Sequence, residues 1–145
     1  MKITTRNFGE IEIQEEKVIT FKEGIPGFED LKQFILIEKK DDVFHYLQSI
    51  EDGDICFVIT DPYYFKKDYT PTIREDYFER LGEGDNDAFT LYAIVTLRDA
   101  VEKSTLNLAG PLLIHVENRQ GIQVITEDKV YTTKHKLVDL IKERG

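Results

Sequence analysis

The residues whose types could support catalysis or metal binding are few, and they are scattered along the chain. The single cysteine, Cys56, lies in an apolar stretch, where burial raises the pKa of a thiol and lowers its reactivity. The histidines, His45, His115 and His135, lie far apart and lack the short ligand spacing of a zinc site. Ser49 is not in a Gly-x-Ser-x-Gly segment, which is typical of hydrolase nucleophiles. These residues predict neither a catalytic centre nor a bound metal.

Two acidic turns contain the oxygen ligands that calcium prefers. Asp85-Asn86-Asp87 and Asp52-Gly53-Asp54 both lack the ligand frame and the terminal Glu of an EF-hand, so we expect solvated turns. No Gly-rich loop follows a strand and opens a helix, which argues against Rossmann and P-loop phosphate sites. The sequence therefore predicts no cofactor, and we expect a protein that is not an enzyme.

The charge balance is strongly acidic. Asp and Glu total 28 against 19 Lys and Arg, a formal net charge of −9, which disfavours direct binding of nucleic acid. An acidic surface attracts basic proteins, but it also keeps a protein in solution, and charge alone favours the second interpretation. No stretch approaches the roughly 18 apolar residues of a membrane helix, and the polar N-terminus is not a signal peptide. We expect a cytoplasmic protein that contacts no membrane.

The hydrophobic pattern predicts an all-β protein. Apolar residues alternate with polar ones or form short runs bounded by turns, which is typical of strands. We expect 9–14 and 18–21 to pair as a hairpin, and the Asp-Gly pair at 52–53 predicts another between 44–49 and 55–60. The remaining expected strands are 33–37, 89–97, 112–116 and 122–126.

Two short helices are predicted beside these strands. The first covers about 71–82, with Pro71 in its first turn and Gly82 at its C-terminal end. The second covers about 133–144, with an apolar stripe made of Leu137, Leu140 and Ile141. Short strands of this kind favour closure, because an open sheet exposes its edges. We expect a small antiparallel β-barrel-like fold, with residues 1–145 forming a single domain.

Three consecutive aromatic residues follow the strand that Asp61-Pro62 interrupts. A strand or helix buries only part of such a run, so at least one of Tyr63, Tyr64 and Phe65 is expected near the surface. The run either forms a binding anchor or covers the end of the barrel, and the second interpretation is slightly favoured. Farther along, Asn107 is expected to hydrogen-bond local backbone.

Several short segments, taken in this order, resemble the FliW family of bacterial flagellar assembly factors. The resemblance covers nearly the whole chain, with one mild departure at Gly110, where the family often has Ala. The matching segments are Phe21 with Gly24-Ile25-Pro26-Gly27-Phe28-Glu29, Phe44-x-Tyr46-Leu47-Gln48-Ser49, Phe57-x-Ile59-x-Asp61-Pro62, Tyr69, Thr105-x-Asn107-Leu108-x-Gly110-Pro111, Gln123-Val124-Ile125 and Tyr131.

The resemblance implies a small β-barrel-like fold and a protein that switches between partners. Members of the family bind flagellin and, separately, the RNA-binding translational repressor CsrA, the carbon storage regulator. Held in this way, the repressor cannot silence flagellin mRNA, and flagellin competes for the same protein. We expect acidic turns to attract the basic repressor and the aromatic run Tyr63, Tyr64 and Phe65 to contact flagellin. The acids in question are Asp41, Asp42, Asp52, Asp54, Asp85 and Asp87.

Two alternatives remain open at the level of sequence. The first is a barrel that binds a small molecule, which would need an internal cavity with convergent polar groups. The second is an enzyme built around His45 or His115, which would need a pocket that joins a histidine to a carboxylate. Nothing in the sequence places such groups together.

Overall fold

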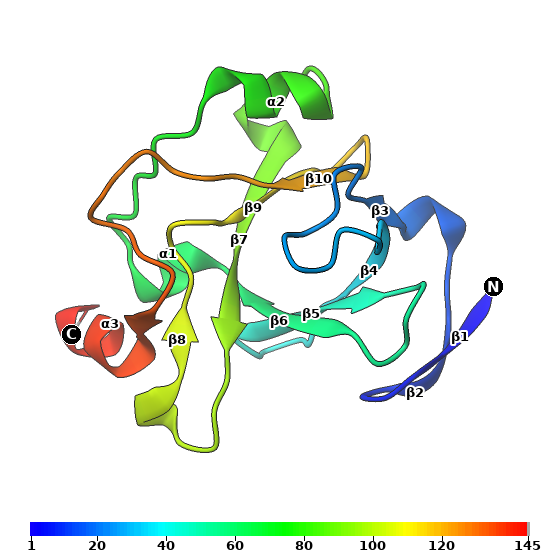
Figure 1. Cartoon of the computed structure of the whole chain (residues 1–145), viewed down its shortest axis with the longest axis horizontal. Coiled ribbons are helices and arrows are strands. Elements are labelled where there is room, and N and C mark those ends of the chain that lie inside the picture. Colours follow the sequence, from blue (N-terminus) through cyan, green and yellow to red (C-terminus); the bar gives the residue numbers. More distant parts are fainter. Residues whose placement is uncertain (145) are drawn as a thin grey trace.

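The computed structural model describes residues 1–144, and within them seven strands close into a barrel flanked by three short helices (Figure 1). The helices are α1 (Pro62–Phe65), α2 (Glu75–Leu81) and α3 (Leu137–Arg144). The strands are β1 (Lys2–Thr5), β2 (Gly9–Glu12), β3 (Ile19–Thr20), β4 (Gln33–Ile37), β5 (Phe44–Ser49), β6 (Cys56–Thr60), β7 (Phe89–Thr96), β8 (Thr105–Leu106), β9 (Leu112–His115), β10 (Gln120–Gln123) and β11 (His135–Lys136).

The expected β-barrel is confirmed, but its wall is not wholly antiparallel. The strands follow the order β7-β6-β5-β4-β3-β10-β9, and β9 pairs back onto β7. Strand directions cannot alternate all the way around a closed ring with an odd number of members. The mismatch falls between β3 and β10, which pair in parallel at Thr20 and Gln120, while the other neighbours in the ring are antiparallel.

Apolar side chains from five of these strands and from the segment after β3 fill the barrel interior. Phe21, just after β3, is fully buried and meets Phe34 edge-on at 5.4 Å between ring centroids. Gly121 allows β10 to cross this ring, because a Cβ there would lie 2.6–2.9 Å from three Phe21 ring atoms. The interior cluster consists of Ile19, Phe21, Ile25, Phe34, Leu47, Ile59, Leu112 and Ile114.

The helices cover the outside of the barrel around β7 (Figure 1). Tyr77 and Leu81 of α2 pack with Leu113, Ile122 and Val124 of the wall and the segment after it. A separate cluster forms under α1 and α3, and it contains Phe65, Tyr69, Ala93, Val95, Leu106, Leu108, Tyr131, Leu137 and Leu140. No helix among residues 1–144 is long and apolar enough to cross a lipid bilayer.

The predicted hairpin between 9–14 and 18–21 is wrong. β2 pairs with β1 instead, and β3 pairs with β4 and β10. The turn between β1 and β2 is held by the Thr5 hydroxyl, which donates to the Gly9 carbonyl and accepts from the Phe8 N–H. Gly9 has φ of +67°, a left-handed conformation that glycine adopts without strain. The 3₁₀ turn at Glu15–Lys17 then separates β2 from β3.

The helix predictions are confirmed in place but not in extent. α2 begins four residues later than expected, because the backbone is still extended at Arg74, and it ends at Gly82 as predicted. α3 begins at Leu137, because the preceding residues form β11 beside β8. α1 is an additional helix, in which Pro62 takes the first position and the Asp61 carboxylate accepts the Tyr63 N–H.

Two of the predicted turns are observed, and contacts of Gly53 and Asn107 explain them. The hairpin between β5 and β6 is confirmed, and Gly53 is required there because a Cβ would collide with the Thr4 carbonyl of β1. The Asn107 side chain accepts the backbone N–H groups of Ala109 and Gly110 at 3.1 and 2.8 Å, as the sequence predicts.

Candidate functional site

The aromatic run in α1 divides into a buried and an exposed part. Pro62 and Phe65 lie one helical turn apart and point into the fold, and Phe65 is only 4% exposed. Tyr63 and Tyr64 face outward and are 42% and 44% exposed. Phe65 therefore covers the barrel, whereas the two tyrosines are available at the surface.

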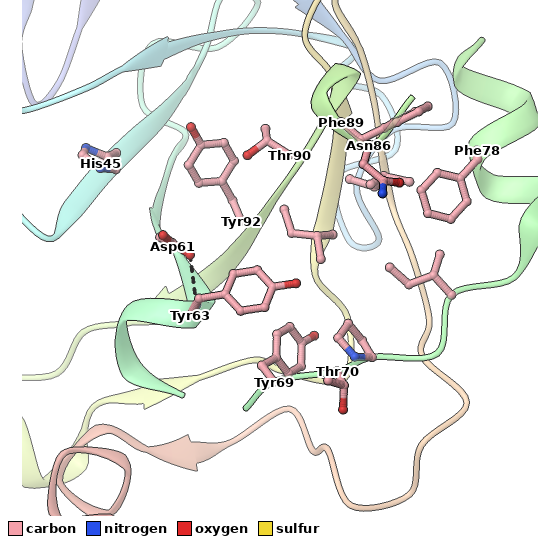
Figure 2. Close-up of a pocket in the computed structure, with 14 residues that line it drawn as sticks. His45, Asp61, Tyr63, Tyr69, Thr70, Phe78, Asn86, Phe89, Thr90 and Tyr92 are labelled. Carbon is pink, nitrogen blue, oxygen red and sulfur yellow. Dashed lines mark hydrogen bonds between the residues drawn. The ribbon is translucent and has the colours of Figure 1, made fainter. Parts of the chain in front are cut away.

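Beside α1 lies an open groove of about 680 Å³ along the first half of β7 (Figure 2). Figure 2 shows the ring of Tyr63 reaching from α1 toward β7, with Phe78 of α2 on the opposite side. The residues that line this β7 groove are His45, Asp61, Tyr63, Tyr69, Thr70, Pro71, Ile73, Phe78, Asn86, Phe89, Thr90, Leu91, Tyr92 and Leu113. Apolar rings thus alternate with hydroxyl groups, an amide and a carboxylate, a mixture that is typical of a binding surface.

The electrostatic environment of the β7 groove is negative. Burial raises the pKa of Tyr92, and the carboxylates of Glu38 and Asp61 raise it further. Burial also raises the pKa of Tyr63, and the Asp61 carboxylate raises it further. The Tyr69 hydroxyl donates to the Leu108 carbonyl at 2.7 Å. Burial is the largest cause of the raised pKa of Tyr69. The β7 groove is therefore suited to neutral or cationic groups and not to anions.

The six acids predicted to attract the repressor are all exposed, but they occupy two ends of the barrel. The acids at 41–42 precede β5, and the acids at 85–87 precede β7. Both groups lie at the end of the barrel that carries Asp61 and the β7 groove. Those in 52–54 follow β5, whose six residues separate the two ends by roughly 20 Å. The structure therefore divides the predicted acids into Asp41, Asp42, Asp85 and Asp87 on one end and Asp52 and Asp54 on the other.

Three of these acids also stabilise their own turns. The carboxylates of Asp42, Asp52 and Asp85 each accept a backbone N–H two residues later, at 3.0–3.1 Å. Within residues 1–144, the side chains of Asp54 and Asp87 accept no such bond, so substitutions there change charge without removing a turn contact.

The histidines and the cysteine have structural environments. His115 is 1% exposed. Its Nδ1 accepts the Asn118 N–H, so Nε2 carries the proton and donates to the Glu83 carbonyl at 2.7 Å. Burial raises the pKa of the Cys56 thiol, as predicted. Among residues 1–144, no three His, Cys, Asp or Glu side chains are grouped so that they could hold a metal ion.

The sequence interpretation missed most of the β7 groove. Tyr69, Phe78 and Tyr92 come from three separate segments, and only the closed barrel brings them together. One signal of an unpaired strand edge was present in the sequence. The predicted strand at 89–97 is longer than the strand at 55–60, which the Asp61-Pro62 pair ends early. Within the described chain, apolar side chains fill the barrel interior, and the β7 groove lies outside it. The alternative of a small molecule bound inside the barrel therefore has no support.

The chain forms a closed β-barrel with a filled interior, two exposed tyrosines and a groove at its wall. Residues 2–137 match the FliW protein family. The chain belongs to the FliW family, which consists of flagellar assembly factors, and this confirms both the sequence resemblance and the expectation that it is not an enzyme.

Relatives match over nearly their whole length. The flagellar assembly factor FliW of Alkaliphilus metalliredigens is 41% identical over 145 residues, 99% of this chain and 90% of the relative. The factor of the same name from Caldanaerobacter subterraneus subsp. tengcongensis is 42% identical over 144 residues, 98% of this chain and 96% of the relative. A crystal structure of the flagellar assembly factor FliW has a TM-score of 0.87 and 36% identity, and covers 94% of this chain and 96% of that one.

Proposed function

We propose that this chain acts in the cytoplasm as a single domain that binds flagellin and, separately, the translational repressor CsrA. Binding of the repressor relieves its silencing of flagellin mRNA, and flagellin competes for the same protein. The observation that carries this proposal is membership of the flagellar assembly factor family along nearly the whole chain. The acidic charge of −9 supports it, since a repressor that binds RNA presents a basic surface.

Capture from the native cytoplasm tests the proposal. The chain is immobilised, and the retained proteins are identified by mass spectrometry and then purified for affinity measurements. We expect both flagellin and CsrA to be retained, and soluble flagellin to release bound CsrA. Retention of neither protein would refute the proposed function.

Tyr63 and Tyr64 are the expected contacts for flagellin. Replacing both with alanine is expected to lower the affinity for flagellin roughly tenfold or more, because exposed aromatic anchors dominate protein interfaces. Calorimetric titration measures this, with Val101→Ala as the control, since Val101 is 56% exposed beyond the far end of β7. Phe65→Ala is expected to destabilise the fold instead, because Phe65 is buried. Unchanged affinity in the double variant would exclude α1 from the interface.

The division of the acids between two ends gives a test for the repressor surface. We propose that CsrA approaches the end that carries the β7 groove, so Asp87→Lys is expected to weaken its binding. An exposed charge pair is worth about 0.2–1 kcal/mol, a factor of about 1.4 to 5 in affinity, and the loss should vanish at high salt. Asp54→Lys changes the same charge at the opposite end and is the matched control. Equal losses from both variants would mean that only net charge matters.

A further inference from the structure

The β7 groove lies along the edge of a strand and not on either face of the wall. Thr90 and Tyr92 belong to the side of β7 that faces the barrel interior, where Tyr92 packs against the interior cluster. Phe89 and Leu91 belong to the outer side and pack under α2. All four line the groove, and residues on both sides of a strand can line one space only where that space borders the strand's edge.

The neighbouring strand ends before it reaches this part of β7. β6 pairs with β7 only at Ala93, Ile94 and Val95, and its last residue, Thr60, faces Ala93. In the same register Leu91 would face Pro62, which has no N–H and starts α1. The first half of β7 is therefore paired on one side only, with β9.

The unpaired backbone groups can be named from the hydrogen-bond pattern. The carbonyls of Ala88 and Ile94 accept bonds from Val116 and Asn107, on the β9 and β8 side, so even-numbered residues of β7 point that way. Strand geometry directs Phe89 and Leu91 to the opposite side. The Phe89 N–H bonds to Asn86, which leaves the Phe89 carbonyl and both backbone groups of Leu91 without a backbone partner among residues 1–144.

We propose that the edge of β7 at residues 89–92 accepts an extended, basic segment of a partner protein as an additional strand. Added strands gain their affinity from main-chain hydrogen bonds and their selectivity from pockets for alternate side chains. Alternate side chains of the segment would contact Thr90 and Tyr92 on one side and Ile73 and Phe78 on the other. The proposal rests on the proposed function only in assuming that this chain binds proteins.

Charge selects a basic segment. Asp61 lies at the end of the groove where β6 stops, and Asp85 and Asp87 flank the groove residue Asn86 at the start of β7. An extended segment along the edge would pass between these carboxylates, so lysine or arginine residues in it find opposite charges at both ends.

Amide hydrogen exchange of the wild-type protein, followed by NMR, tests the inference directly. In the free protein the Leu91 amide should exchange at least tenfold faster than those of Thr90 and Tyr92, which point toward β9. The probes are a capped six-residue peptide of alternating lysine and valine, purified flagellin and purified CsrA. At least one should slow Leu91 exchange tenfold or more, and a glutamate–valine peptide should not.

A pair of variants isolates the backbone donor. Leu91→Pro removes the edge N–H, and Leu91→Ala removes the same side-chain contacts but keeps that N–H. We expect Leu91→Pro to bind the active probe roughly three- to tenfold more weakly than Leu91→Ala, since one hydrogen bond is lost. If Leu91→Pro does not fold, the exchange measurement on the wild type decides alone.

The outcomes separate this inference from the proposed function. A Leu91 amide as protected as Thr90 in the free protein, or unaffected by all three probes, overturns the strand-addition site. Flagellin and CsrA binding without protection of Leu91 overturns the site and leaves the proposed function intact. Protection by the lysine–valine peptide alone supports the site even if neither protein binds.

Discussion

Replacement of Phe21 with alanine is expected to lower the free energy of unfolding by about 3–5 kcal/mol, which is the usual cost of removing a buried phenylalanine. Phe21 is fully buried where β10 passes next to β3, at the one parallel contact of the barrel wall. Denaturant unfolding measures the loss. Phe28→Ala is the matched control, because Phe28 is 38% exposed and its removal should cost much less. Similar losses from both would show that the crossing at Phe21 does not limit stability.

The contact between Phe21 and Gly121 adds a second test of the same crossing. Gly121→Ala should cost about 1–3 kcal/mol, because the added methyl group overpacks the Phe21 ring. Combined with Phe21→Ala, the methyl group gains space, so the double variant should lose less stability than the sum of the two single variants. Strict additivity would mean that the backbone of β10, and not the ring, limits the space at this position.

Replacement of Tyr69 with phenylalanine is expected to cost about 1–3 kcal/mol at neutral pH, because the buried Leu108 carbonyl loses its hydroxyl donor. The ring itself stays, including its edge-on contact with Tyr131 at 4.8 Å, so the change isolates one hydrogen bond. Thermal unfolding measures it. Tyr64→Phe is the control, since its hydroxyl belongs to an exposed side chain, and it should leave the melting temperature unchanged.

Tyr69 also predicts how stability depends on alkaline pH. Its pKa is raised by burial above the ordinary tyrosine value of 10.0, so the unfolded chain releases this proton first. The stabilisation is therefore complete below pH 10 and declines as the pH rises beyond it. Tyr69→Phe lacks this proton, so the stability difference between wild type and variant should shrink above pH 10. A constant difference would contradict a hydroxyl that remains protonated in the folded state.

Turn residues were predicted correctly from the sequence, whereas one strand pairing was not. The Asp-Gly pair at 52–53, Gly82 and Asn107 marked their turns correctly, because each acts on backbone a few residues away. The hairpin at the N-terminus was wrong, because alternation in residues 9–14 identifies a strand but not its partner. The partner was 2–5, a polar segment whose pairing depends on the turn at Thr5 and Gly9.

The aromatic run at 63–65 was left with two interpretations. The structure buries Phe65 and leaves Tyr63 and Tyr64 exposed, and their role in binding stays a prediction. The sequence predicts that a single strand or helix does not bury all three rings. Which ring turned inward depended on the phase of α1, and that phase is set by Pro62 and the Asp61 carboxylate at its start.

The sequence by itself determined the class of this protein: an acidic β-barrel of the FliW family. Composition, turn residues and the spacing of short motifs are local properties, so they can be read along the chain. Only the tertiary structure decided which surface is available. Seven strands must close with one parallel pair, and β6 ends before β7 does, so the barrel wall keeps an open edge beside Tyr63 and Asp61. That edge results from the register of distant strands, which no single segment specifies.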